Sequence, residues 1–140
     1  MDLSGRRGLR TAVLEAVRTG RSAVVLGPEG SGRTRLAEGV VELLAQEMRA
    51  VHLVRGADAA AGIPLAPIAP LLAEVGLTGT DALGVYSRLP GILSQQRAVL
   101  VVDDAAELDR ATGVLLGQIV RADVPVVLVV RDAREIIRSV

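Results

Sequence analysis

The sequence predicts an α/β protein in which helices flank a parallel sheet. Segments with strand character alternate with segments of helical periodicity, an order typical of parallel α/β sheets. Half of the residues are hydrophobic, yet the chain has one tyrosine, no phenylalanine and no tryptophan. The core is therefore built from Val, Leu, Ile and Ala, which suits a buried sheet. The 140 residues are enough for one such domain, covering 1–140.

The charge balance and the absence of cysteine exclude several classes of function. The 16 basic residues, all arginine, equal the 16 acidic ones, so the charge gives no reason to expect nucleic acid as a partner. Without cysteine, disulfides, thiolate metal sites and cysteine nucleophiles are excluded. The N-terminus lacks the apolar region of a signal peptide, and no apolar run approaches the roughly 20 residues that span a bilayer. We therefore expect a soluble, cytoplasmic protein.

The first part of the chain is expected to hold two helices and two strands. Apolar residues recur at helical spacing over about residues 6–19, and Gly20 closes this helix. Ser22–Leu26 is a short apolar run rich in β-branched residues, which indicates a buried strand. A second amphipathic helix follows over about residues 32–49, and Val51–Val54 forms the next strand.

The middle of the chain is expected to hold a loop and two helices. A Gly/Ala-rich loop covers residues 55–66, and a short helix then begins with Pro67 or Pro70 in its first turn. Asp81 caps another helix over residues 82–89.

The last part of the chain continues the alternation. Ala98–Asp104 is an apolar strand that ends in two acids, and an amphipathic helix follows over about residues 109–121. Val126–Val130 forms the fourth strand, and residues 133–140 begin a further helix.

The stretch “GPEGSGRT”, Gly27 to Thr34, has the spacing of a phosphate-binding P-loop, GxxxxGK[ST]. Glycines leave room for backbone N–H groups to wrap a phosphate, and the following helix points its positive N-terminal end at the same place. Thr34 supplies the hydroxyl expected on Mg²⁺. The alternative is a glycine-rich turn without a ligand. The residues expected to bind nucleotide here are Gly27, Pro28, Glu29, Gly30, Ser31, Gly32, Arg33, Thr34 and Arg35.

Arg33 stands where the P-loop motif has lysine. Arginine still neutralises phosphate, but it is larger and planar, so the exchange is not conservative in geometry. Phosphoryl transfer depends mostly on positioning, so a misplaced γ-phosphate costs rate. We therefore expect nucleotide binding with slow or no hydrolysis.

A second element is the acid pair that ends the third strand. In P-loop NTPases such an acid holds Mg²⁺, so we expect Asp103 to assist the metal. Its neighbour Asp104 would orient or deprotonate the attacking water. The alternative is that these acids cap the next helix, although Asp109 is the better cap because it directly precedes the amphipathic run.

Arg131 follows the fourth strand and has two interpretations. It either senses the γ-phosphate and stabilises transition-state charge, or it is a solvated arginine paired with Asp132. Three other residues favour structural roles. His52 has no partner cysteine or nearby histidine, Ser31 has no base close in sequence, and Tyr86 is the sole aromatic and offers no stacking platform.

The chain resembles the N-terminal NTPase domain of large ATP-binding LuxR-type (MalT-like) transcriptional regulators, which are AAA-like signal-transduction (STAND) ATPases. The resemblance covers nearly the whole chain. It is carried, in order, by “GRRGLRTAVLEAV”, “AVVLGPEGSGRTRLAEGVVELL”, “PLAPIAPLL”, “VLVVDDAAELDRATGVLLGQIV” and “PVVLVVR”. The P-loop is generic to many NTPases, whereas “DDAAELD” and “PLAPIAPLL” are more specific to the family. The fold implied is a three-layer P-loop NTPase fold of the ASCE/AAA-like type.

The resemblance implies a switch. In that family ATP binding, linked to an inducer, favours an oligomer that activates transcription, and a separate C-terminal helix-turn-helix binds DNA. It implies that the P-loop residues hold ATP and Mg²⁺, with Asp103 on the metal, Asp104 on the water and Arg131 as sensor. Arg6 matches the opening “GR” box near the nucleotide, although an acid normally follows where this chain has “RG”.

The resemblance also implies the strand order 5-1-4-3-2, of which the last strand is missing here. We therefore expect a fragment of a larger regulator, or a degenerate stand-alone copy, without its own DNA-binding domain. The strand Ser22–Leu26 would then have one exposed edge, so the chain is expected to be marginally stable or to self-associate.

Three functions remain open from the sequence. The first is an ATP-binding regulatory switch, the second a nucleotide-free protein-interaction domain that keeps the fold, and the third an active ATPase. The third would need a lysine in the loop and a substrate pocket. ATP is preferred over GTP by the resemblance, since the guanine-reading motif NKxD does not occur. No membrane partner and no direct DNA contact are expected.

Overall fold

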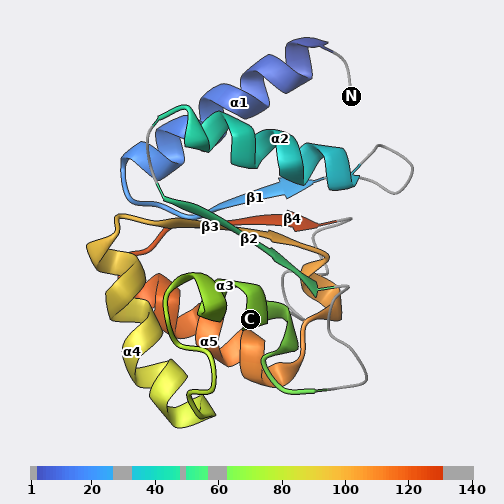
Figure 1. The fold of residues 1–140 in the computed structure, drawn as a ribbon. Coiled ribbons are helices and arrows are strands. Elements are labelled where there is room, and N and C mark those ends of the chain that lie inside the picture. Colours follow the sequence, from blue (N-terminus) through green and yellow to red (C-terminus); the bar gives the residue numbers. More distant parts are fainter. Residues whose placement is uncertain (1–2, 27–32, 48–49, 57–62, 131–140) are drawn as a thin grey trace.

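Four parallel strands form one sheet in the order β1-β4-β3-β2. The computed structural model describes residues 3–26, 33–47, 50–56 and 63–130 (Figure 1). The strands are β1 (Ala23–Leu26), β2 (Val51–Arg55), β3 (Val99–Asp103) and β4 (Val126–Val130). This is the order 1-4-3-2 that the resemblance implied for these strands.

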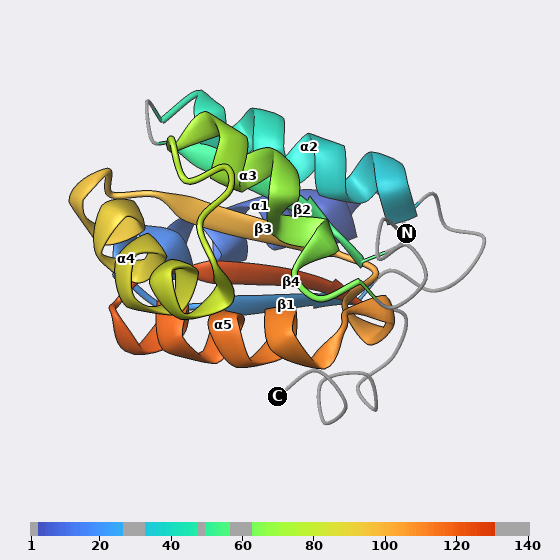
Figure 2. The same cartoon turned by 60° about the horizontal axis from the view of Figure 1, so that its bottom comes forward.

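The helices lie on both faces of the sheet and make three layers. One face carries α1 (Leu3–Arg18) and α2 (Arg33–Ala45), and the other carries α3 (Ala69–Glu74), α4 (Ala82–Gln95) and α5 (Arg110–Arg121) (Figures 1 and 2). Two short 3₁₀ segments, Ala66–Ile68 and Ala105–Glu107, precede α3 and α5. The predicted α/β class with a flanked parallel sheet is confirmed.

The core is divided by the sheet because successive strand side chains point to opposite faces. Val99 and Val101 of β3 pack with α1 and α2, whereas Leu100 and Val102 pack with the helices of the other face. Every residue of β3 is buried, as a central strand covered on both sides requires. This burial extends to the last residue of the strand, Asp103.

Most helix ends follow the predicted signals. Gly20 adopts a positive φ of 77° and closes α1, and Asp81 caps α4 by accepting a hydrogen bond of 2.7 Å from the Gly84 N–H. Pro67 and Pro70 both lie in first turns, one in the 3₁₀ segment and one in α3. The predicted helix over residues 133–140 lies outside the described residues.

Two predicted helix ends are wrong. The helix predicted to run to residue 49 ends at Ala45, because the Glu47 N–H turns back to the Leu44 carbonyl and tightens the last turn before β2. Residues 48–49 lie outside the described residues. The helix predicted to end at Leu89 continues past Pro90 to Gln95. Burial of Leu89 and Leu93 on the same face stabilises this continuation and offsets the hydrogen bond that proline cannot donate.

Among the helices of the described residues, none has the length and apolar character that crossing a membrane requires.

Candidate nucleotide-binding site

The site lies at the edge of the sheet where all four parallel strands end. Figure 1 shows the strand arrows pointing to one edge, where α2 also begins. β1 ends at Leu26, directly before “GPEGSGRT”, and β3 ends at Asp103. Only β4 separates these two strands, so they lie about 10 Å apart at a spacing of about 4.8 Å per strand. The end of β1 and Asp103 therefore share one edge of the sheet.

Asp103 is a buried carboxylate, with 1% of its side chain exposed. Its Oδ1 accepts a hydrogen bond of 3.0 Å from the Asp104 N–H, and its Oδ2 lies 3.5 Å from Nη1 of Arg55. Asp103 alternates with Val99 and Val101 along β3, so its side chain lies on the face that α2 covers. Burying a carboxylate is costly unless it is paired, and here the cation of β2 supplies the pairing.

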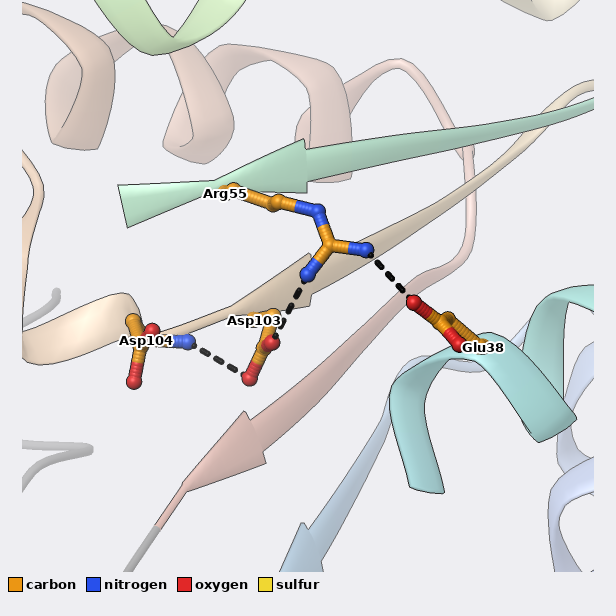
Figure 3. Close-up of polar contacts among 4 residues, drawn as sticks. All are labelled: Glu38, Arg55, Asp103 and Asp104. Carbon is orange, nitrogen blue, oxygen red and sulfur yellow. Dashed lines mark hydrogen bonds and ion pairs between the residues drawn. The ribbon is translucent and has the colours of Figure 1, made fainter. Parts of the chain in front are cut away.

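Arg55 joins the sheet to α2 (Figure 3). It ends β2 and is the register partner of Asp103 on the neighbouring strand. Its Nη1 faces Asp103, while its Nη2 donates a hydrogen bond of 3.1 Å to Oε1 of Glu38 on α2. One guanidinium therefore lies between two carboxylates that belong to different elements.

Asp104 turns the chain immediately after β3. It adopts left-handed backbone angles, φ 54° and ψ 49°, a conformation that Asp tolerates better than most residues. Its carbonyl accepts a hydrogen bond of 2.9 Å from the Glu107 N–H. The same carbonyl lies so close to Gly56 that a Cβ built there would be 2.0 Å from it. Glycine directly after Arg55 is what allows this approach.

Asp109 caps α5, as the sequence predicts. Its Oδ2 accepts hydrogen bonds from the backbone N–H groups of Thr112 and Leu65, at 3.1 and 3.0 Å, and its Oδ1 accepts one from the Thr112 hydroxyl. Burial alone would raise the pKa of Asp109, but these hydrogen bonds outweigh it and hold the pKa below its ordinary value. Neither Asp103 nor Asp104 is needed as the cap of α5.

The structure describes only some of the residues that the sequence predicts to bind phosphate. Arg33 and Thr34 form the first turn of α2, whose backbone begins at the carboxyl edge of the sheet, and Arg35 follows with an exposed side chain. Arg6 lies in α1. The remaining predicted residues lie outside the described residues, namely Gly27, Pro28, Glu29, Gly30, Ser31, Gly32 and Arg131.

His52 and Tyr86 have structural partners. Nδ1 of His52 lies 2.9 Å from Oε2 of Glu74, and Nε2 lies 3.2 Å from Oε1 of Gln96. The Tyr86 hydroxyl donates a hydrogen bond of 3.3 Å to the Ala111 carbonyl. Both residues therefore contact helices of the α3–α5 face, and the interpretation of His52 as a satisfied edge histidine is confirmed.

The donor chemistry at Asp103 fits a magnesium ion. The carboxylate of Asp103 is a hard oxygen ligand, the type that magnesium prefers. Within the described ranges, no three His, Cys, Asp or Glu side chains gather into a metal cluster. Magnesium in nucleotide sites uses one or two carboxylates together with phosphate and water, so a single buried Asp is compatible with it.

Sequence reasoning missed Arg55, Glu38 and Gly56. Arg55 ends the strand “VHLVR” just as Asp103 ends “VLVVD”. The strand order 4-3-2 places those two strand ends side by side. An arginine at the end of the strand next to Asp103 was therefore the signal in the sequence that predicts an ion pair. Glu38 becomes visible only when α2 is laid over the sheet, because it is 17 residues from Arg55.

Comparison with known proteins shows the fold. The chain is similar to a solved structure of the Aeropyrum pernix ORC2 protein, described as ADPNP-ADP complexes, with a TM-score of 0.59 and 18% sequence identity. The likeness covers 96% of this chain and 42% of that one, so this chain spans less than half the length of its structural neighbour. A scan against protein-family models and a search of curated proteins found no match. The predicted P-loop NTPase fold is confirmed.

Proposed function

We propose that this chain is an ATP-binding regulatory module that holds Mg-ATP at the carboxyl edge of its sheet. The observation that carries the proposal is Asp103, a buried carboxylate at the end of a central strand, two strands from the P-loop sequence. Aspartate is seldom fully buried unless it is paired. In P-loop NTPases an acid at the end of this strand holds Mg²⁺ beside the phosphates.

The binding set follows from the elements that meet at this edge. Residues Gly27 to Thr34 would surround the phosphates with backbone N–H groups, supported by the positive end of α2. Arg33 would neutralise phosphate charge, and Thr34 and Asp103 would hold Mg²⁺, which supplies charge neutralisation between the phosphate oxygens. Arg35 and Arg6 would supply further positive charge beside the nucleotide, and Arg131 would sense the γ-phosphate.

Slow or absent hydrolysis is part of the proposal. Asp104 is the candidate for positioning the attacking water, but its left-handed backbone and the close approach of Gly56 tie it to the turn after β3. Arginine in place of the P-loop lysine is a second reason to expect slow hydrolysis, because its geometry at the phosphates differs from that of lysine. Both features favour a module that binds nucleotide over one that turns it over quickly.

The regulatory role rests on the resemblance to MalT-like LuxR-type regulators. Under that proposal the module is a cytoplasmic switch and forms the domain 1–140 of a larger regulator. DNA would be bound by a separate part of that regulator, and the switch would act through self-association. The likeness to a protein solved with ADPNP and ADP supports a nucleotide site on this fold.

A nucleotide-free interaction domain is the second candidate, and one observation favours it. Arg55 already pairs with the buried carboxylate of Asp103, so this charge has a compensating cation without a metal ion. Arg33 also departs from the P-loop pattern. The two candidates differ in whether nucleotide binds at all.

Equilibrium binding of ATP tests the proposal. Titration of the chain with ATP by calorimetry, in Mg²⁺ and in EDTA, should show binding that weakens at least about tenfold without Mg²⁺ or in Thr34→Ala, about 1.4 kcal/mol. Asp123→Asn is the matched control, because Asp123 is exposed in the turn before β4, at the opposite edge of the sheet. Absence of heat and of saturation under both conditions, with a folded protein, would establish the nucleotide-free domain instead.

A further inference from the structure

We propose that Arg55 is a built-in counter-cation of Asp103, which leaves this carboxylate for Glu38 when Mg-nucleotide binds and so sets the Mg²⁺ requirement of the site. The inference rests on the proposed function, because it takes Asp103 as the residue that holds the metal ion. It assigns two residues, Arg55 and Glu38, that no sequence motif singles out.

The first step is the position of Arg55. It and Asp103 are register partners at the ends of adjacent parallel strands, so their side chains lie on the same face of the sheet. Asp103 has 1% of its side chain exposed, whereas Arg55 has 31%. Water therefore solvates the guanidinium far better than the carboxylate, and Arg55 contributes to the compensation of the buried charge of Asp103.

The second step is the division of the guanidinium between two acids (Figure 3). The contact to Glu38 is a hydrogen bond of 3.1 Å, while the contact to Asp103 is an ion pair of 3.5 Å. Charge-assisted hydrogen bonds are typically about 2.7–2.9 Å, so the Asp103 contact is the looser one. Arg55 therefore already makes its shorter contact with Glu38, the acid with which it would stay paired after leaving Asp103.

The third step is competition at Asp103. A guanidinium and a divalent cation beside the same carboxylate repel each other, and each lowers the affinity of Asp103 for the other. Glu38 has 55% of its side chain exposed, so Arg55 shifts toward it without losing its charge partner or being buried further. Glu38 also lies one turn after Thr34 on α2, which couples the movement of Arg55 to the helix that follows the P-loop.

The test is the Mg²⁺ concentration at which ATP affinity is half-restored, measured by calorimetry on the full chain. Arg55→Gln removes the competing cation and should lower this midpoint by about tenfold, the equivalent of about 1.4 kcal/mol. Glu38→Gln removes the negative charge of the alternative partner but keeps its acceptor oxygen, so Arg55 is held less strongly away from Asp103 and the midpoint should rise about two- to fivefold. The opposite directions of the two shifts are specific to an exchange between two acids.

Glu47→Gln is the matched control. Glu47 follows the end of α2, about two and a half turns after Glu38, and pairs with Arg18 at 2.6 Å, so its loss should leave the midpoint unchanged. Shifts of the same sign in both test variants, or a midpoint equal to that of the unmodified chain in Glu38→Gln, would overturn the inference. Glu38→Gln decides alone if Arg55→Gln does not fold. If the unmodified chain binds no ATP at any Mg²⁺ concentration, the proposed function fails first and the inference with it.

Discussion

At the residue scale, the site is organised by one buried charge and the groups that compensate it. Asp103 accepts a hydrogen bond from the Asp104 N–H and forms an ion pair with Arg55. Asp109, and not Asp103 or Asp104, caps α5. The strand-end acid and the helix cap were predictable because both depend on local sequence. Arg55 was not predicted, because its role depends on which strand lies beside β3.

A substitution at Arg33 should change the rate of ATP hydrolysis much more than the affinity for ATP. Replacing Arg33 with Lys restores the compact point charge of the P-loop motif and should raise the ATP hydrolysis rate up to about a hundredfold, the cost associated with a misplacement of about 1 Å. ATP affinity should change by less than about tenfold. Steady-state phosphate release measures the first and calorimetry the second, and a rate that stays unchanged would contradict a role for Arg33 in limiting turnover.

Asp109 makes a pH-dependent contribution to stability. Its pKa is lowered in the folded state, so its stabilisation is present above about pH 4 and is lost as the pH falls through the folded pKa. Asp109→Ala should cost about 1–2 kcal/mol near pH 7, because α5 loses its cap and the Leu65 and Thr112 N–H groups lose their acceptor.

Chemical denaturation of both forms across pH 2.5–7 checks this account of Asp109. The difference in unfolding free energy between the unmodified chain and Asp109→Ala should shrink toward the acid end of the series. A difference that is constant over the whole range would show that the carboxylate charge contributes nothing.

At the element scale, the end of β2 is built against the turn after β3. Arg55 contacts Asp103 through its side chain, and Gly56 approaches the Asp104 carbonyl through its backbone. Hydrophobic periodicity predicts most of the strands and helices, since it is local. It gives wrong ends for α2 and α4. The end of α2 depends on the tightened turn before β2, and the end of α4 depends on the burial of Leu89 and Leu93.

Gly56→Ala tests the contact between these two elements. A Cβ at Gly56 would stand 2.0 Å from the Asp104 carbonyl oxygen, so backbone must move, at a cost of about 1–3 kcal/mol of stability. The control is Gly117→Ala on α5, where a Cβ meets nothing within 4 Å and helix propensity should add about 0.5–1 kcal/mol. Denaturant unfolding distinguishes the two, and a Gly56→Ala protein as stable as the parent would rule out the close approach.

At the scale of the whole molecule, the described sheet has β1 as an edge strand with apolar side chains in contact with solvent. β1 pairs with β4 on one side, and 43% of Val24 and 50% of Leu26 are exposed. The strand order was available from the resemblance, but the exposure of these side chains depends on how far the helices reach across the sheet. An edge strand of this kind favours association with another strand.

Self-association through β1 is therefore expected at high protein concentration. Sedimentation velocity should show a dimer that forms with increasing concentration, and Val24→Lys should weaken dimerisation at least about tenfold because a charged side chain on an edge strand disfavours pairing. Leu83→Lys is the control, since Leu83 is 75% exposed and lies on a helix, α4, that is not part of the sheet edge. A rigid monomer at every concentration, or equal effects of both variants, would argue against β1 as the interface.

The central claim, that this fold holds Mg-nucleotide at Asp103, is tested most directly by thermal unfolding with and without Mg-ATP. A ligand that binds only the folded state adds about 2.7 kcal/mol at a hundredfold excess over its dissociation constant, a rise of roughly 5–10 °C for a chain of this size. The account predicts this rise in the unmodified chain and in Asp123→Asn, and its loss in Asp103→Asn. A cooperative transition that Mg-ATP does not move, or one that moves equally in Asp103→Asn, would contradict it.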